Sequence, residues 1–430
     1  MNDHDMERMR AILIEGGLTD VFDAQEADVI IVNTCCVREK AEQKFYSRMG
    51  RLRAIKKKRG AILGVTGCIA QLEKKNILDR LPFIDFALGT ASIDKISEAV
   101  EEATKGSPYF DFTENGGSTS LLIKPIDTQS PVKTYVTIMK GCNNFCSYCV
   151  VPYVRGRESS RESREIIGEI KKLAAKGTKE VTLLGQNVNS YNKNRDYISF
   201  PALLREINSI DGIERIRFVT SHPKDLSPEL IDCFTGLDKL CEAIHLPFQS
   251  GSDKILTLMN RGYTKRDYKD KIMVLRERRP DMAVTADCIV GFPGEDENDF
   301  LETMDLIEEI QFDNIFSFAY SPRKFTGAAA LPGTVSKELA QERLHHFQQV
   351  QKSITIAKNK KMEGKRLEVL VEDISRNSEE EVMGRTRTNK IVNFKGTSDM
   401  IKNLVEVDII KGYANSLKGE NPKVKGGIPC

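Results

Sequence analysis

Residues 140–158 read KGCNNFCSYCVVPYVRGRE and place Cys142, Cys146 and Cys149 at the spacing C-x3-C-x2-C, directly after the β-type run TYVTIMK. A tight loop brings three thiols spaced in this way within bonding reach of one metal centre. Structural zinc takes four ligands, and no fourth Cys or His lies nearby in the sequence. Three thiolates on a four-iron cluster leave one iron open, which a catalytic metal site needs. The motif therefore predicts a catalytic iron–sulfur cluster, with structural zinc as the alternative.

The cysteine motif opens a region in which β-type runs alternate with helical stretches. Six such units over residues 132–335 predict an open or closed parallel (β/α) barrel. Residues 336–362 are expected to form a long connecting helix. Residues 363–430 alternate β-type residues with turns, which is typical of a small antiparallel barrel. The β-type runs of the six units are KTYVTIMKG, EVTLLGQN, RIRFVTS, AIHLPFQSG, AVTADCIVGFPG and NIFSFAYS.

The region before the motif has the rhythm strand, helix, strand over residues 1–103, which indicates a parallel α/β domain. Residues 104–131 are rich in Gly, Ser, Thr and Pro and have no sustained period, so we interpret them as a linker. A chain of 430 residues is too long for one ordinary core. The predicted fold class is therefore α/β, with three domains.

Composition limits the possible functions. The 64 Lys and Arg nearly balance the 62 Asp and Glu, so a nucleic-acid surface would have to come from local patches. The sequence has no run of 18 apolar residues and its first residues lack the apolar core of a signal peptide, so we expect a cytoplasmic protein without membrane contact. In a reducing compartment, clustered cysteines are metal ligands or catalytic groups more often than disulfides.

The cysteine motif, with Tyr148 before its last Cys, resembles the signature of the radical S-adenosylmethionine (SAM) superfamily. The longer string over residues 140–158 resembles the tRNA methylthiotransferases of the MiaB type, and further matching strings span almost the whole chain. The family implies an N-terminal domain with an auxiliary 4Fe-4S cluster, a radical-SAM barrel and a C-terminal TRAM domain that binds RNA. The further strings include NTCCVREKAEQK (33–44), LLGQNVNSY (183–191), TSHP (220–223), HLPFQSGSDKIL (245–256) and DCIVGFPGE (287–295).

The resemblance also implies a reaction, the insertion of a methylthio group at C2 of N6-isopentenyladenosine next to the tRNA anticodon. One SAM would methylate a sulfur at the auxiliary cluster, and a second would supply a 5′-deoxyadenosyl radical. The expected partners are the tRNA anticodon stem-loop and an electron donor such as flavodoxin or ferredoxin, with the enzyme as a monomer. Related family members instead modify threonylcarbamoyl-adenosine or a ribosomal protein. A non-catalytic RNA-binding protein with a structural metal is a further alternative.

The same resemblance implies that Cys142, Cys146 and Cys149 hold the SAM cluster as the catalytic centre, with Tyr148 beside the adenine of SAM. Ligands of such barrels gather at the carboxyl ends of the strands. The candidates there are Gly185, Gln186, Gln249, Ser250 and Gly251, and the turn GFPGE (291–295), with Gly291 and Glu295, is expected to let the backbone approach SAM.

Two groups of arginines are candidate RNA contacts. Arg155 and Arg157 follow the metal loop, where a basic rim would position an anionic RNA through its phosphates. Arg385 and Arg387 alternate on one predicted strand of the C-terminal barrel, which is consistent with an RNA-facing surface.

The auxiliary cluster depends on the N-terminal cysteines. Cys35 and Cys68 each follow an apolar run, and the ends of parallel strands share an edge, so we expect their sulfurs to lie together. The family uses three cysteines here, and the first precedes a segment that resembles MNDHDMERM, where this sequence begins. We expect that the native start lies upstream, with Cys36 as the alternative third ligand, although neighbouring side chains on a strand point to opposite faces. The chain as written should then hold the SAM cluster firmly and the auxiliary cluster poorly or not at all. A further alternative function follows, a chain that cleaves SAM without inserting sulfur.

Overall fold

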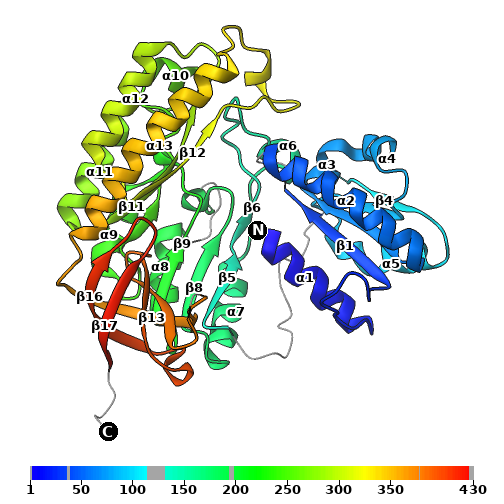
Figure 1. The fold of residues 1–430 in the computed structure, drawn as a ribbon, viewed down its shortest axis with the longest axis horizontal. Helices are drawn as coiled ribbons and strands as arrows, with labels where there is room; N and C mark the ends of the chain where they lie inside the picture. Colours follow the sequence, from blue (N-terminus) through cyan, green and yellow to red (C-terminus); the bar gives the residue numbers. More distant parts are fainter. Residues whose placement is uncertain (1, 36–38, 114–130, 193–197, 377, 426–430) are drawn as a thin grey trace. The chain divides into compact units, whose positions relative to one another are not determined.

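The structure, a computed structural model, describes residues 2–35, 39–113, 131–192, 198–376 and 378–425 (Figure 1). The chain forms two compact units. We call the first the N-terminal unit; it comprises residues 1–128, 139–161 and 321–329. The second, the barrel unit, comprises residues 129–138, 162–320 and 330–430. The cysteine motif thus belongs to the N-terminal unit, whereas the predicted domain boundaries place it in the barrel.

The N-terminal unit contains a four-stranded parallel sheet in the order β1 (Val29–Thr34), β2 (Ile62–Gly67), β3 (Phe86–Leu88) and β4 (Tyr109–Asp111). The parallel α/β prediction is therefore confirmed. Strand β4 lies within residues 104–131, where a linker was predicted. Its three residues are too few to show a period, so only the pairing with β3 reveals it.

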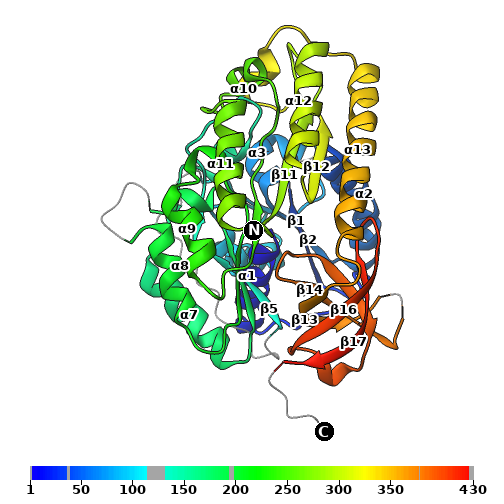
Figure 2. The same ribbon diagram turned by 90° about the vertical axis from the view of Figure 1, so that its left-hand side faces the viewer.

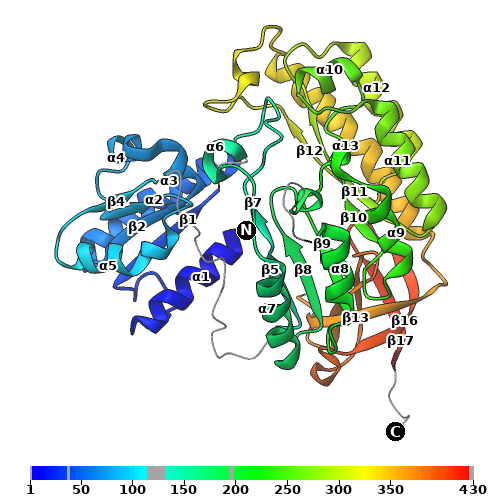
Figure 3. The ribbon, with the colours of Figure 1, turned by 180° about the vertical axis from the view of Figure 1, so that it is seen from behind.

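Helices cover both faces of this sheet (Figure 3), as is usual for parallel sheets. On one face α1 (Asn2–Glu15) and α5 (Ile96–Thr104) pack through Met9 and Ile96 against Phe86. On the other face α2 (Glu39–Arg59) and α3 (Cys68–Glu73) pack through Met49 and Ile69, and the short α4 (Ile77–Arg80) follows. These two cores hold the strand ends in fixed positions.

The cysteine motif is attached to the second of these cores. It lies between β6 (Met139–Lys140), which pairs with β7 (Ser159–Ser160), and the short helix α6 (Val151–Arg155). Val150 and Val154 are buried among the residues of α2 and α3. The apolar positions just after the last cysteine therefore hold the loop against the N-terminal sheet.

The barrel unit contains the six predicted parallel strands. Figure 2 labels β5, β11 and β12 among them, and Figure 3 also labels the other three. One sheet is β5 (Lys133–Thr137), β8 (Glu180–Leu184) and β9 (Arg215–Phe218); the other is β10 (Ala243–His245), β11 (Ala283–Val290) and β12 (Asn314–Ala319). A parallel bridge between Ile216 and Leu240 links them. Of the helices that the structure describes, none is long and apolar enough to cross a membrane. The helices here are α7 (Ser163–Ala175), α8 (Phe200–Asn208), α9 (Pro228–Gly236), α10 (Asp253–Leu258), α11 (Lys265–Arg278), α12 (Glu297–Ile310) and α13 (Lys337–Lys360).

The C-terminal strands close into a barrel in the order β13-β14-β15-β17-β16 around Val369, Val382 and Phe394. The pairs are antiparallel except β15–β17, which is parallel, so the purely antiparallel expectation is wrong at that seam. The strands are β13 (Arg366–Ile374), β14 (Glu381–Thr386), β15 (Ile391–Lys395), β16 (Leu404–Gly412) and β17 (Leu417–Val424).

Two arginines of β9 join this small barrel to the larger one. Arg215 is fully buried and its guanidinium donates to the carbonyl of Arg385 at 2.6 Å. Arg217 donates to the carbonyls of Thr386 and Arg387, both at 2.8 Å. A buried guanidinium needs acceptors for its N–H groups. Main-chain oxygens at the end of β14 supply them, and this explains why the two barrels form one unit.

Candidate functional site

The cysteine loop folds back on itself between β6 and α6. Gly141 has a φ of +76°, and a Cβ there would lie 2.1 Å from the carbonyl oxygen of Arg157, so the turn requires glycine. The N–H of Cys142 donates to the carbonyl oxygen of Gly156 at 3.2 Å, and the N–H of Cys149 donates to the carbonyl oxygen of Cys146 at 2.9 Å. Cys142 and Cys146 are buried and Cys149 is half-buried. The three thiols therefore share one anchored turn.

The donor set of this loop fits a cluster with three protein ligands. Across the described ranges, no three His, Cys, Asp or Glu side chains converge closely enough to hold a metal ion. The fit to an iron–sulfur cluster therefore depends on the three thiols and their spacing.

Exposed aromatic rings accompany the cysteines. Phe145 is 38% exposed and Tyr153 is 47% exposed, with their rings 6.5 Å apart, edge to face. The guanidinium of Arg157 lies 5.3 Å from the centre of the Phe145 ring. The exposed position of Arg157 is compatible with the predicted phosphate contact. The two rings were not predicted as site residues, although aromatic residues between and after loop cysteines could have suggested them.

Two N-terminal cysteines lie at one edge of the sheet. Cys35 directly follows β1, and Cys68 directly follows β2 as the first residue of α3. The register pairs Thr34 with Gly67, so Cys35 and Cys68 occupy the next, adjacent positions. The Thr34 hydroxyl donates to Thr66 and accepts from the N–H of Ile69, which holds the two strand ends together. Cys36, the alternative third ligand, lies outside the described residues.

Arg155 lies beside Cys68. Its side chain is 7% exposed, its guanidinium is 2.7 Å from the carboxylate of Asp5, and it also donates to the Cys68 sulfur. Although burial lowers the pKa of Arg155, the attraction of Cys68 and Asp5 outweighs burial and raises it. This internal engagement does not favour a phosphate contact, and the RNA contact of Arg155 stays an untested prediction.

The surroundings of Arg155 carry more positive than negative charge. Burial, followed by nearby cations that include Arg161, lowers the pKa of His4 to about 3. Burial and then Arg8 lower the pKa of Lys140. Arg8 is itself paired with Asp94. A buried excess of cations beside a thiol favours an anion, and a thiolate-ligated cluster is anionic.

In the barrel unit, Gln249 combines features that are typical of a ligand-binding residue. It follows β10, has a φ of +69° and is 7% exposed. Within the part of the chain that the structure describes, its buried Oε1 has no hydrogen-bond partner. Backbone strain and an unsatisfied buried acceptor at a strand end are typical of binding sites. The donor groups of SAM would satisfy this oxygen.

The loops after β8 and β9 meet beside each other. The Thr220 hydroxyl donates to the carbonyl of Gly185 at 2.6 Å, and Asn187 donates to Asp225 at 2.8 Å. Among the described groups, the Asn187 Oδ1 and the Ser221 hydroxyl are buried without a partner. Neither was predicted, although both lie in the strings LLGQNVNSY and TSHP. Gln186, which was predicted, is half-buried there.

Several other residues that were predicted to bind SAM also have packing or hydrogen-bonding roles within the chain. A Cβ at Gly251 would lie 2.5 Å from the Glu302 carbonyl oxygen, and one at Gly291, whose φ is +69°, would lie 2.6 Å from the Ala340 Cβ. Glu295 accepts from the Gly291 N–H and from Arg343, and burial raises its pKa. Ser250 is buried and accepts from the N–H of Ser252. Tyr148 is half-buried in the cysteine loop. Their contacts with SAM remain predictions.

The arginines of the small barrel have internal partners. Arg387 pairs with Glu242 at 2.7 Å and donates to the carbonyl of Leu240. Arg385 lies 3.4 Å from Glu372 and bonds to Asn389. Both side chains are about three-quarters buried. They hold the unit together through these partners, and the prediction that they face RNA stays untested.

Comparison with known proteins identifies the class. Residues 136–307 match the Radical SAM superfamily, residues 1–89 the Uncharacterized protein family UPF0004, and residues 360–421 the TRAM domain. The fold is similar to that of the radical S-adenosylmethionine methyltransferase TsrM from Kitasatospora setae. That match has a TM-score of 0.59 at 14% identity and covers 76% of this chain and 72% of TsrM. The chain is thus a radical SAM enzyme.

The relatives identify the family. The chain is 52% identical to the tRNA-2-methylthio-N(6)-dimethylallyladenosine synthase of Syntrophus aciditrophicus, over 98% of this chain and 92% of that protein. It is 50% identical to the enzyme of the same name from Geobacter metallireducens, over 98% and 96%. The chain belongs to this family of radical SAM methylthiotransferases. The alternatives that act on threonylcarbamoyl-adenosine or a ribosomal protein are not favoured.

Proposed function

We propose that the chain methylthiolates C2 of N6-dimethylallyladenosine next to the anticodon of tRNA. The observation that carries this proposal is the identity of about one half, along nearly the whole chain, with enzymes named for that product. The TRAM domain supports an RNA substrate. A tRNA substrate places the reaction in the cytoplasm, and the donor would be a one-electron protein such as flavodoxin or ferredoxin. We propose that the enzyme acts as a monomer.

Cys142, Cys146 and Cys149 would hold the cluster that binds SAM. When bound, this cluster supplies the electron that cleaves SAM to a 5′-deoxyadenosyl radical. The chain's own task is to hold SAM in one orientation. Gln249 would accept a hydrogen bond from SAM through its unsatisfied Oε1, and Asn187 and Ser221 offer two further buried groups at neighbouring strand ends.

Cys35 and Cys68 would be ligands of an auxiliary cluster. Arg155 would donate to the Cys68 sulfur there, and hydrogen bonds to ligand sulfurs are one of the factors that set a cluster's reduction potential. Buried cations from α1 and from the residues on either side of the cysteine loop would offset the negative charge. Whether this chain completes the site, with Cys36 as third ligand, is decided by its iron content. About eight iron atoms per chain, reduced to about four in Cys36→Ala, would show that it does.

RNA would meet the surface around the cysteine loop. Arg157 is exposed there and would contact a phosphate, which fixes register without reading sequence. The exposed rings of Phe145 and Tyr153 would stack with bases, a contact worth roughly 1–3 kcal/mol per base.

The proposal is tested with anaerobically reconstituted protein, SAM, dithionite and an anticodon stem-loop that carries N6-dimethylallyladenosine. Mass spectrometry of the digested RNA should show the 2-methylthio nucleoside. Cys146→Ala should abolish both the product and 5′-deoxyadenosine, whereas Cys233→Ala, a buried thiol outside the motif, should not. Formation of 5′-deoxyadenosine without a modified nucleoside would count against the proposal, as would modification of threonylcarbamoyl-adenosine only.

A further inference from the structure

The sheet β10-β11-β12 has one polar face. Parallel sheets are ordinarily buried on both sides. Here Ile244, Ala286 and Cys288 are buried on one face. The alternating positions belong to the other face, where the side chain of His245 is 17% exposed and that of Asp287 is 32% exposed. A partly exposed carboxylate on a parallel sheet indicates a face that meets a ligand.

Three strands bring complementary groups together on this face. The register places His245 beside Thr285 and Asp287 beside Phe316. The His245 Nδ1 lies 3.0 Å from the Thr285 hydroxyl, and its Nε2 lies 3.4 Å from the Asp287 carboxylate. The rings of His245 and Phe316 are 6.1 Å apart, edge to face. We call His245, Asp287 and Phe316 the sheet patch.

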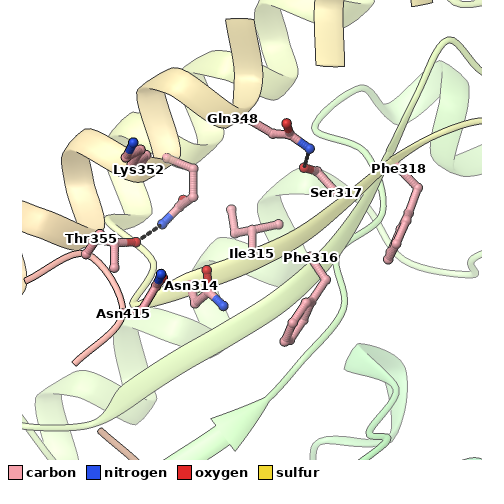
Figure 4. A pocket seen from close by; sticks show the side chains of 11 residues that line it. Asn314, Ile315, Phe316, Ser317, Phe318, Gln348, Lys352, Thr355 and Asn415 are labelled. Carbon is pink, nitrogen blue, oxygen red and sulfur yellow. Dashed lines mark hydrogen bonds between the residues drawn. The ribbon is translucent and has the colours of Figure 1, made fainter. Parts of the chain in front are cut away.

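A cavity of about 390 Å³ lies along β12 on the side of α13. Figure 4 shows Phe316 and Phe318 pointing to one side of the strand, while Ser317 faces α13 and accepts from Gln348 at 3.3 Å. Phe316 is 47% exposed. Asn415 of the small barrel also lines this cavity. The Phe316 ring projects from the opposite face of the strand, where its exposed surface offers an apolar contact to a planar ligand.

The sheet patch adjoins a predicted SAM contact. The N–H of Gln249 donates to the carbonyl of Asp287 at 2.9 Å, and Gln249 is bridged to Cys288. A molecule seated on the patch would therefore lie next to Gln249. A base that loses a hydrogen to a radical derived from SAM must lie beside SAM, so this position suits the substrate base.

We propose that the Asp287 carboxylate accepts a hydrogen bond from the N6–H of the substrate adenine, while Phe316 packs against the base and its dimethylallyl group. This inference rests on the proposed function. An N6-substituted adenine keeps a single N6–H donor, and an ionised carboxylate only accepts. Within the described chain, His245 supplies the one side-chain hydrogen bond or ion pair to the Asp287 carboxylate, so acceptor capacity remains. His245 is a positioning residue that orients this carboxylate.

The proposal is tested by binding two anticodon stem-loops to the reconstituted full chain. One carries N6-dimethylallyladenosine; the other carries O6-dimethylallylinosine, in which an ether oxygen replaces N6–H. The wild type should bind the first about tenfold more tightly, because the second leaves Asp287 without a donor. Asp287→Ala should bind both RNAs equally. His245→Gln should lower the preference without abolishing it. Asp270→Ala, at an exposed position on α11, should keep the full preference.

A preference that persists in Asp287→Ala would overturn the proposal. So would an unchanged preference in His245→Gln or a weaker affinity of Asp287→Ala for SAM, since the latter would assign the carboxylate to SAM. If Asp287→Ala does not fold, Asp287→Leu is measured in the same way. A wild type that makes the methylthio product without discriminating between the RNAs would overturn this inference alone. A wild type that makes no product and does not discriminate would overturn the proposed function as well.

Discussion

The guanidinium of Arg155 lies 2.7 Å from the carboxylate of Asp5, and the two side chains are only 7% and 10% exposed. Removing one partner of a buried pair leaves an uncompensated charge, at a cost of about 3–5 kcal/mol. We therefore expect Asp5→Asn to destabilise the N-terminal unit by this amount, measured by hydrogen exchange of the amides in β2. The control is the exposed pair that Arg10 of the same helix forms with Asp20, and Asp20→Asn should cost less than about 1 kcal/mol. Equal losses would contradict the argument.

The N-terminal unit should lose stability in mild acid because of His4. Its pKa is lowered to about 3, first by burial and then by nearby cations. Between the ordinary value of 6.5 and 3, the unfolded chain binds a proton that the folded chain excludes, so stability is complete above 6.5 and falls with pH. From pH 6.5 to 5 the loss approaches about 2 kcal/mol. His4→Gln should lack this component, whereas His345→Gln, at an exposed position, should retain it. Identical pH profiles in His4→Gln and wild type would refute the prediction.

Gln249 combines a positive φ with an unsatisfied buried oxygen, and both features cost stability. Gln249→Leu should therefore leave the melting temperature unchanged or raise it, while weakening SAM binding about tenfold or more. Equilibrium dialysis with SAM and thermal unfolding measure the two effects. Gln349→Leu, on the exposed side of α13, should change neither. A variant of Gln249 that binds SAM normally would show that the orphaned oxygen serves another purpose.

Arg157 and Arg387 should differ in how they affect RNA binding. Arg157 is exposed, so Arg157→Gln should lower the slope of log Kd against log salt concentration by about one unit, which corresponds to one lost phosphate contact. Arg387 is paired with Glu242, so Arg387→Gln should leave that slope unchanged and lower the melting temperature of the barrel unit. Both variants are titrated with the same stem-loop at several salt concentrations. A reduced slope for Arg387→Gln would support its predicted phosphate contact.

Local patterns in the sequence were sufficient for much of the fold. The apolar runs before Cys35 and Cys68 predict parallel strands, and the register of β1 and β2 places the two cysteines side by side. The six barrel strands and the helix α13 also follow from alternation and period alone. These features depend on neighbouring residues, so a single sequence contains them.

Local patterns could not predict which arginines are exposed to solvent and which pair with a buried carboxylate. Arg155 lies in a charged run that is typical of solvated surface, yet its partner Asp5 is 150 positions away. Arg387 likewise pairs with Glu242, 145 positions distant. Tertiary packing decides whether a charged side chain is exposed to solvent or has a buried partner. The local sequence does not encode this packing. The three-residue strand β4 escaped prediction for the related reason that its pairing, not its pattern, defines it.

Arg215 and Arg217 bind the small barrel through hydrogen bonds to the main-chain oxygens of residues 385–387. Every residue type offers a carbonyl, so side chains at the end of β14 can change without loss of these bonds. The surface of the small barrel is therefore able to diverge for different RNAs while its attachment stays constant. A transplanted TRAM module should dock on this enzyme if its backbone follows the same path, whatever its sequence.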